Sequence, residues 1–167
     1  IPSNAFRIPS GIRSNKARRG LRNPTKIPRI MRDLKRIILH CAATREGQDF
    51  SVDTIREWHV NGRGWSDIGY HWVIRLDGSI EVGRPLEKSG AHTKGHNKDS
   101  VGVCYIGGCD ADGKPKDTMN PEQEKAWRMI VLSLRTLYGD LTIHGHNEFA
   151  KKACPSFIVK EKFADMY

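Results

Sequence analysis

The sequence has no long apolar run, and this absence sets the first limit on its function. No stretch approaches the roughly 18–20 consecutive apolar residues that a membrane-spanning helix needs. The first residues also lack the apolar core of a secretory signal. We therefore expect neither a transmembrane segment nor a signal peptide.

Closely spaced cysteines are also missing. The four cysteines, Cys41, Cys104, Cys109 and Cys154, form no C-x-x-C pair and show no dense spacing. An even number in a secreted chain would allow two disulfides, with three possible connectivities. Because no signal segment is evident, we favour free thiols or metal ligation in a reducing compartment.

Acidic side chains are almost absent from the first 36 residues. This stretch holds 11 of the 28 Lys and Arg residues and one of the 19 Asp and Glu residues, so it carries +10 while the rest carries −1. It also holds four of the eight prolines. We therefore predict a polybasic N-terminal arm over residues 1–32, partly disordered, attached to one near-neutral domain over residues 33–167. A domain of that length buries a core without disulfides.

Strand-like and helix-like segments alternate along the domain. Asn120-Pro121 followed by Glu122 is a strong helix start, and Asp77-Gly78 between two apolar runs indicates a hairpin. The predicted strands are 36–42, 70–76, 79–82, 101–106 and 141–144, and the predicted helices are 51–60, 120–139 and 156–166. We predict an α/β fold, a mixed central sheet flanked by helices.

Three residues have the chemistry and the placement of a metal site. His40 ends a buried strand, and His146 and Cys154 lie eight residues apart after another strand. Two imidazoles and a thiolate form a three-ligand zinc set that leaves the fourth position for water. Each of the three also has an ordinary structural reading, and His144 is a rival to His146.

Five segments carry a more specific signal. They read ILHCAAT, DIGYHWVIRLDG, GAHTKGHN, SVGVCYIGG and HGHNEFAKKACPSF, and they span about residues 36–159. In this order they resemble the zinc N-acetylmuramoyl-L-alanine amidases of type 2, a superfamily that includes peptidoglycan recognition proteins and small phage endolysins. The resemblance implies the predicted fold and covers about three quarters of the chain. The arm lies outside it.

The resemblance also implies a site. It places the ligands of one Zn²⁺ per chain on His40, His146 and Cys154, and two catalytic residues on Tyr70 and Lys152. The same resemblance places His92, Thr93 and Asn97 in the substrate groove. Zinc activates water at neutral pH, and a nearby ammonium can stabilise the oxyanion that forms on an amide carbonyl. Tyr70 would position the water or pass its proton to the leaving amine.

These expectations describe a zinc amidase that cleaves the bond between N-acetylmuramic acid and L-alanine in peptidoglycan. Its setting would be phage lysis, with synthesis in the host cytoplasm and action as a monomer at the cell wall. One alternative is a peptidoglycan-binding module without activity, although such a module needs neither Tyr70 nor Cys154. A polymerase- or nucleic-acid-directed role is another alternative, because a phage member of the family inhibits its RNA polymerase; the single aromatic of the arm, Phe6, supports base stacking poorly. We expect the arm to bind anionic bacterial surfaces such as lipopolysaccharide or phospholipid.

Overall fold

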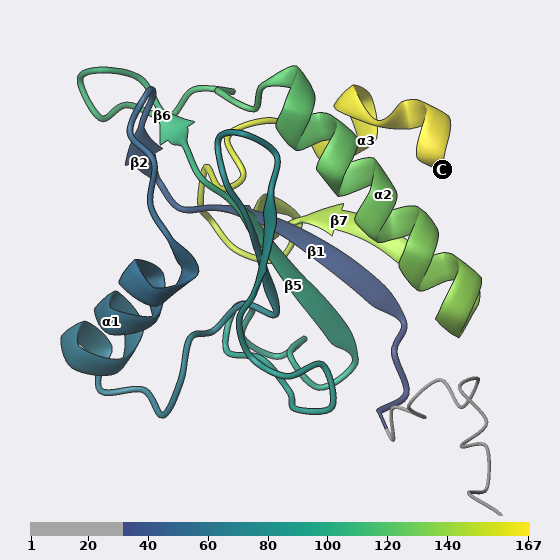
Figure 1. Cartoon of the computed structure of the whole chain (residues 1–167). Helices are drawn as coiled ribbons and strands as arrows, with labels where there is room; N and C mark the ends of the chain where they lie inside the picture. Colours follow the sequence, from purple (N-terminus) through teal and green to yellow (C-terminus); the bar gives the residue numbers. More distant parts are fainter. Residues whose placement is uncertain (1–31) are drawn as a thin grey trace, which may run out of the picture.

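A five-stranded mixed sheet forms the centre of the computed structural model, which describes residues 32–167 (Figure 1). The order across the sheet is β4-β3-β5-β1-β7, in which β3, β5, β1 and β7 are parallel and β4 is antiparallel to β3. The strands are β1 (Arg36–Cys41), β3 (Trp72–Ile74), β4 (Ile80–Val82), β5 (Ser100–Tyr105) and β7 (Thr142–Gly145). The predicted α/β fold with a mixed sheet is confirmed. Of the predicted arm, residues 1–31 lie outside the described residues.

The two longer helices begin where the sequence indicates. In α2 (Pro121–Tyr138), the side chain of Asn120 accepts the backbone N–H of Gln123, whose own side chain accepts that of Asn120. This reciprocal cap satisfies N–H groups that a helix start otherwise leaves without partners. In α1 (Val52–Arg63), Ser51 caps the start. The helix runs three residues beyond the predicted end, because Gly64 adopts φ 70° and closes the last turn.

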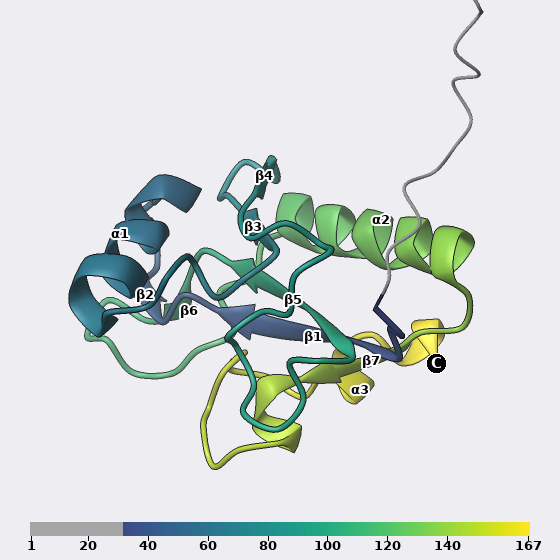
Figure 2. The ribbon, with the colours of Figure 1, turned by 90° about the horizontal axis from the view of Figure 1, so that it is seen from below.

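Alternate residues of the strands face opposite layers. Ile37, Leu39 and Ile74 belong to the main core, which packs against Trp127 of α2. Val73, next to Ile74, belongs instead to a smaller cluster with Ile55 of α1. The period of two that strands impose therefore directs consecutive side chains to different layers. Figure 2 shows α2 along one face of the sheet and the loops after β4 and β7 on the other.

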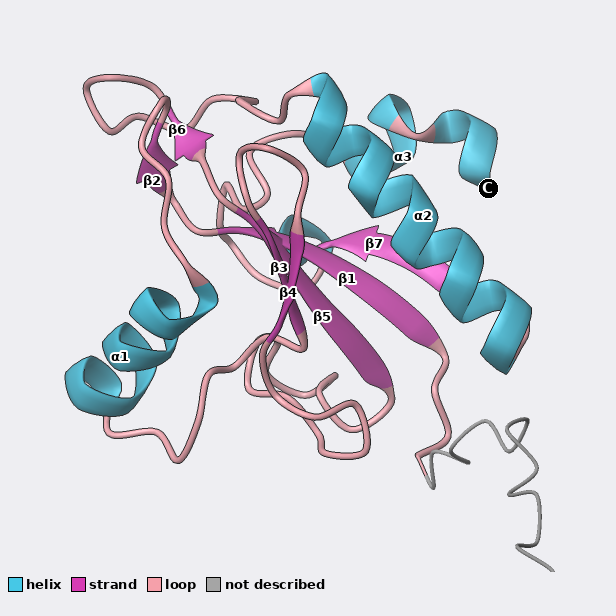
Figure 3. Ribbon diagram, in the orientation of Figure 1, coloured by secondary structure: helices cyan, strands magenta, loops and turns pink. Residues whose placement is uncertain are grey.

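Three local features differ from the sequence prediction (Figure 3). The predicted helix 156–166 is reduced to α3 (Val159–Lys162) and one 3-10 turn, because Phe163 leaves the helical conformation and is fully buried. A two-stranded ladder, β2 (Thr44–Arg45) with β6 (Gly108–Cys109), was not predicted. Two-residue strands are too short to show the alternation by which strands are recognised. Strand β3 is also shorter than the predicted 70–76.

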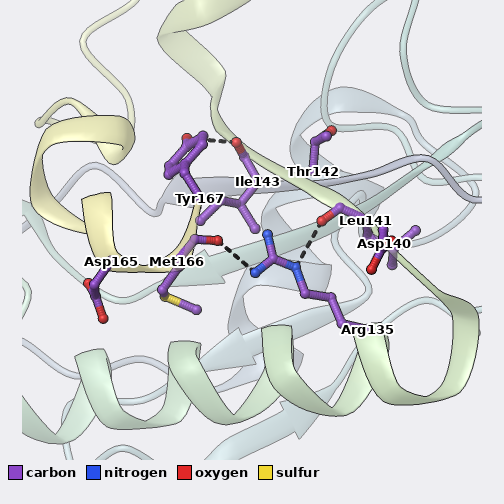
Figure 4. A pocket seen from close by; sticks show the side chains of 8 residues that line it. All are labelled: Arg135, Asp140, Leu141, Thr142, Ile143, Asp165, Met166 and Tyr167. Carbon is purple, nitrogen blue, oxygen red and sulfur yellow. Dashed lines mark hydrogen bonds between the residues drawn. The ribbon is translucent and has the colours of Figure 1, made fainter.

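The free edge of β7 is covered by the end of the chain (Figure 4). Arg135 of α2 donates to the carbonyls of Leu141 and Met166, at 2.9 and 2.7 Å. The hydroxyl of Tyr167 donates to the carbonyl of Ile143 at 2.8 Å. Because an uncovered edge strand invites pairing with another chain, these contacts protect the sheet.

Within residues 32–167, no helix is long and apolar enough to cross a membrane. The four cysteines are free thiols, and Cys41, Cys104 and Cys109 are buried.

Candidate active site and metal centre

His40, His146 and Cys154 meet on the face of the sheet opposite α2. Their candidate ligand atoms all lie within 4.8 Å of one another, and no other group of three such residues gathers in the described part of the chain. His40 Nδ1 lies 3.8 Å from Cys154 Sγ, and the rings of His40 and His146 are 4.6 Å apart. Tetrahedral zinc holds nitrogen and sulfur donors roughly 3.3–3.8 Å apart. The donor set therefore fits a zinc ion with small adjustments.

Parallel strands bring these residues together. His40 is the fifth residue of β1, a central strand between β5 and β7, and His146 directly follows β7. Since the carboxyl ends of parallel strands share one edge of a sheet, residues at those ends become neighbours. Cys154 joins them because its sulfur accepts the backbone N–H of Cys41 at 3.2 Å. The rival His144 points elsewhere, with its Nδ1 3.1 Å from Glu148.

Burial keeps the two imidazoles neutral. Burial is the largest cause that lowers the pKa of His40 well below its usual value, and the charges of His92, His146 and Lys152 add to it. Burial and Lys152 also lower the pKa of His146. Neutral imidazoles keep the lone pair that a metal ion needs. The protonation states at neutral pH therefore suit ligation.

The thiol of Cys154 has a second thiol beside it. A hydrogen bond with Cys154 lowers the pKa of Cys41 to about 7, while that bond and burial raise the pKa of Cys154. A metal ion that takes the Cys154 thiolate must therefore displace a proton. Metal uptake should accordingly become stronger as the pH rises.

Tyr70 and Lys152 lie beside the three donors. The rings of Tyr70 and His40 are 5.1 Å apart. Burial raises the pKa of Tyr70 well above its usual value, so its hydroxyl stays protonated and can donate. Lys152 is exposed and lines the same groove, whereas the neighbouring Lys151 does not.

A groove of about 720 Å³ opens above the metal donors. The loop from His92 to Asn97 forms one wall of it, and Asn97 Oδ1 holds this loop by accepting the backbone N–H groups of His92 and Thr93 at 2.9 and 2.8 Å. Thus seven of the eight residues of the predicted site line one groove, and the eighth, His40, is buried next to it with its Nδ1 3.8 Å from Cys154 Sγ. Their roles remain predictions.

The sequence reasoning did not identify several other residues of the groove. Arg63 and Lys94 line it together with Lys152, and among residues 32–167 no Asp or Glu lines it. Trp65 forms part of the wall, with the Arg63 guanidinium 5.3 Å from its ring centre. The turn at Gly64 places these two side chains here. The sequence signal that could have indicated them is the glycine that ends the helix, directly followed by the aromatic residue Trp65.

Comparison with known proteins agrees with this site. The family model for N-acetylmuramoyl-L-alanine amidase matches residues 31–157. The endolysin of Klebsiella phage KP32 is 43% identical over 128 residues, 77% of this chain and 84% of that protein. The endolysin of Escherichia phage T7 is 42% identical over 124 residues, 74% of this chain and 82% of that protein.

A solved structure gives the same result for the fold. The N-acetylmuramoyl-L-alanine amidase LysC from Clostridium intestinale URNW superimposes with a TM-score of 0.65 at 26% identity, covering 80% of this chain and 87% of that one. The chain therefore belongs to the N-acetylmuramoyl-L-alanine amidase family, and it is a peptidoglycan amidase related to phage endolysins.

Proposed function

We propose that His40, His146 and Cys154 hold one Zn²⁺ ion, and that the chain uses it to cleave the amide between N-acetylmuramic acid and L-alanine. The observation that carries this proposal is the convergence of the three donors within 4.8 Å of one another, with His146 and Cys154 lining the groove. A bound zinc ion supplies an electrophilic centre that makes water nucleophilic at neutral pH.

The remaining groups of the site then have distinct tasks. The ammonium of Lys152 stabilises the negative charge that develops on the amide oxygen during attack. The hydroxyl of Tyr70 orients the attacking water and passes a proton toward the departing amine of L-alanine. Both interactions strengthen in the transition state, so they act on turnover more than on substrate binding.

The charge of the groove fits an anionic substrate. Arg63, Lys94 and Lys152 line it, and the described part of the chain adds no acidic side chain to the wall. The stem peptides of peptidoglycan carry carboxylates, which cations attract and orient. We assign contact with these peptides to the part of the His92–Asn97 loop that runs from Thr93 to Asn97, because it forms the wall beside the metal donors.

Mass analysis of digested peptidoglycan tests the reaction directly. Digestion by the zinc-loaded protein should release free stem peptides that begin with L-alanine. New reducing sugar ends without such peptides would identify a glycosidase and refute the proposal.

Variants separate turnover from metal binding. Tyr70→Phe and Lys152→Ala should each retain zinc and lose most of the activity, whereas Lys151→Ala should behave like the wild type, since Lys151 does not line the groove. A Tyr70→Phe or Lys152→Ala variant that retained wild-type turnover would remove that residue from the mechanism.

We propose a second, separate role for the basic arm. Residues 1–36 carry +10, and each basic residue near an anionic membrane contributes about 1 kcal/mol of binding. The arm would then bring the domain to lipopolysaccharide or phospholipid after the protein, made in the host cytoplasm, reaches the cell wall as a monomer.

Deletion of residues 1–31 tests the arm. This deletion should leave hydrolysis of soluble peptidoglycan fragments unchanged and weaken co-sedimentation with anionic vesicles at low salt. The difference should shrink as salt screens the charges. Equal sedimentation of the full chain and the deletion variant would refute membrane targeting. If the deletion instead weakened only the binding of DNA or of RNA polymerase, the nucleic-acid or polymerase role would be favoured.

A further inference from the structure

Both ring nitrogens of His92 have partners inside the protein. Its Nδ1 lies 2.8 Å from His40 Nε2 and 3.0 Å from Thr93 Oγ1. Its Nε2 lies 3.2 Å from Ser100 Oγ. Only 8% of His92 is exposed. The imidazole therefore faces the candidate metal ligand, and neither nitrogen is left for a substrate group.

Two glycines form the slot that holds this imidazole. A Cβ atom on Gly102 of β5 would lie 2.5 Å from His92 Cδ2, and one on Gly90 would lie 2.6 Å from the same atom. Carbon atoms do not approach so closely without displacement. The ring of His92 can therefore reach His40 only because both positions lack a side chain.

The direction of each hydrogen bond follows from the geometry. His40 Nδ1 faces Cys154 Sγ, the side on which the metal donors meet, so its proton lies on Nε2. This N–H donates to His92 Nδ1, with Thr93 Oγ1 as a second acceptor at 3.3 Å. His92 then carries its own proton on Nε2 and donates it to Ser100 Oγ.

We propose that His92 is a positioning residue of the metal centre, which fixes the ring orientation and the tautomer of the ligand His40. The inference rests on the zinc site proposed above. Metal-binding histidines usually donate their second N–H to a carboxylate, a carbonyl or water, and removal of that partner typically weakens metal affinity 10–100-fold. Here a buried imidazole takes the place of that acceptor.

A pair of nearly isosteric variants isolates the hydrogen bond. In His92→Asn, the amide oxygen replaces the Nδ1 acceptor, whereas His92→Leu fills the same space without an acceptor. Zinc affinity, measured by competition with a chromogenic chelator, should fall about 10–100-fold in His92→Leu. The affinity of His92→Asn should stay close to that of the wild type.

His59→Leu is the matched control. His59 is also 8% exposed and accepts the Gly69 N–H through Nδ1, but it has no hydrogen bond to a metal ligand. Its replacement should leave zinc affinity nearly unchanged. Equal affinities of His92→Leu and His92→Asn, or an equal loss in His59→Leu, would overturn the inference.

Two further measurements keep the test decisive. Zinc content of the wild type is determined first, so a protein that binds no zinc refutes the proposed metal centre itself rather than the role of His92. If His92→Leu does not fold, the wild type decides the question by nuclear magnetic resonance with labelled histidine. A coupling across the hydrogen bond between His40 Nε2 and His92 Nδ1 is expected, and its absence would overturn the inference.

Discussion

Protonation of the buried His71 should limit the stability of the fold below neutral pH. Its Nδ1 accepts the N–H of Gly102 at 3.0 Å, and its Nε2–H donates to the carbonyl of Lys88 at 2.8 Å. Burial, as the largest cause, with the charges of Arg32 and Arg84, lowers the pKa of His71 from 6.5 to about 4. The folded state thus holds a neutral ring that the unfolded chain would protonate near pH 6.5.

The sign and size of the effect follow by linkage. Above pH 6.5 the imidazole is neutral in both states, so its contribution to stability is fully present. As the pH falls from 6.5 toward 4, only the unfolded chain binds the proton, and the free energy of unfolding decreases. Between pH 7 and pH 5 this single residue should remove about 2 kcal/mol.

Urea denaturation of zinc-saturated protein at the two pH values measures this loss. His71→Asn retains an acceptor near the Nδ1 position but does not titrate, so its loss between pH 7 and pH 5 should be smaller by about 2 kcal/mol. Val73→Ala removes methyl groups from a fully buried position in β3, so it should be less stable than the wild type at both pH values. Its decrease in the free energy of unfolding between pH 7 and pH 5 should equal that of the wild type. An equally large loss in His71→Asn would show that the ring protonates freely within the fold.

The remaining predictions concern the proposed metal site and Arg32, which lies just before β1. Cys154→Ser should lose zinc affinity while His144→Gln retains it, as measured by zinc content after dialysis, because only Cys154 belongs to the donor set. Removal of zinc by a chelator should lower the melting temperature. When zinc is added back, the melting temperature should recover and rise further with zinc concentration. Arg32→Gln should reduce stability by about 1–3 kcal/mol and speed proteolysis of the loop before β5, because the Arg32 guanidinium donates to the carbonyls of Leu86, Lys88 and Asn97. Unchanged cleavage rates in Arg32→Gln would show that the loop holds its conformation without this side chain.

Local signals in the sequence were sufficient for the framework of the fold. The cap at Asn120 and the Asp77-Gly78 turn act within a few residues, so they could be read without knowledge of the tertiary structure. The grouping of His40, His146 and Cys154 depended on the family resemblance, because the spacing of these residues alone is weak evidence for a metal site. The choice of Lys152 over Lys151 depended on family resemblance, since adjacent lysines look alike in a sequence.

Contacts between residues far apart in the sequence could not be predicted from local patterns. His40 and His92 are hydrogen-bonded across 52 positions of sequence, and the slot for His92 depends on Gly102 in a third segment. Nothing near His92 in the sequence reveals which residue its nitrogens will face. The end of the chain escaped prediction for a similar reason, because burial of Phe163 ends a helix that its local sequence would continue.

The proposed metal centre would combine one ligand from a central strand, His40, with two ligands from the segment that follows β7. His40 lies on β1, which pairs with both β5 and β7, so its backbone cannot move without disturbing the whole sheet. His146 and Cys154 bracket a segment that starts with one 3-10 turn and contains no strand, and the Cys154 sulfur accepts the Cys41 N–H. Metal binding should therefore order the segment between His146 and Cys154 more than the sheet. If His92 fixes the ring of His40, the position of the metal is set from the rigid side, and the loop that also carries Lys152 adjusts to it.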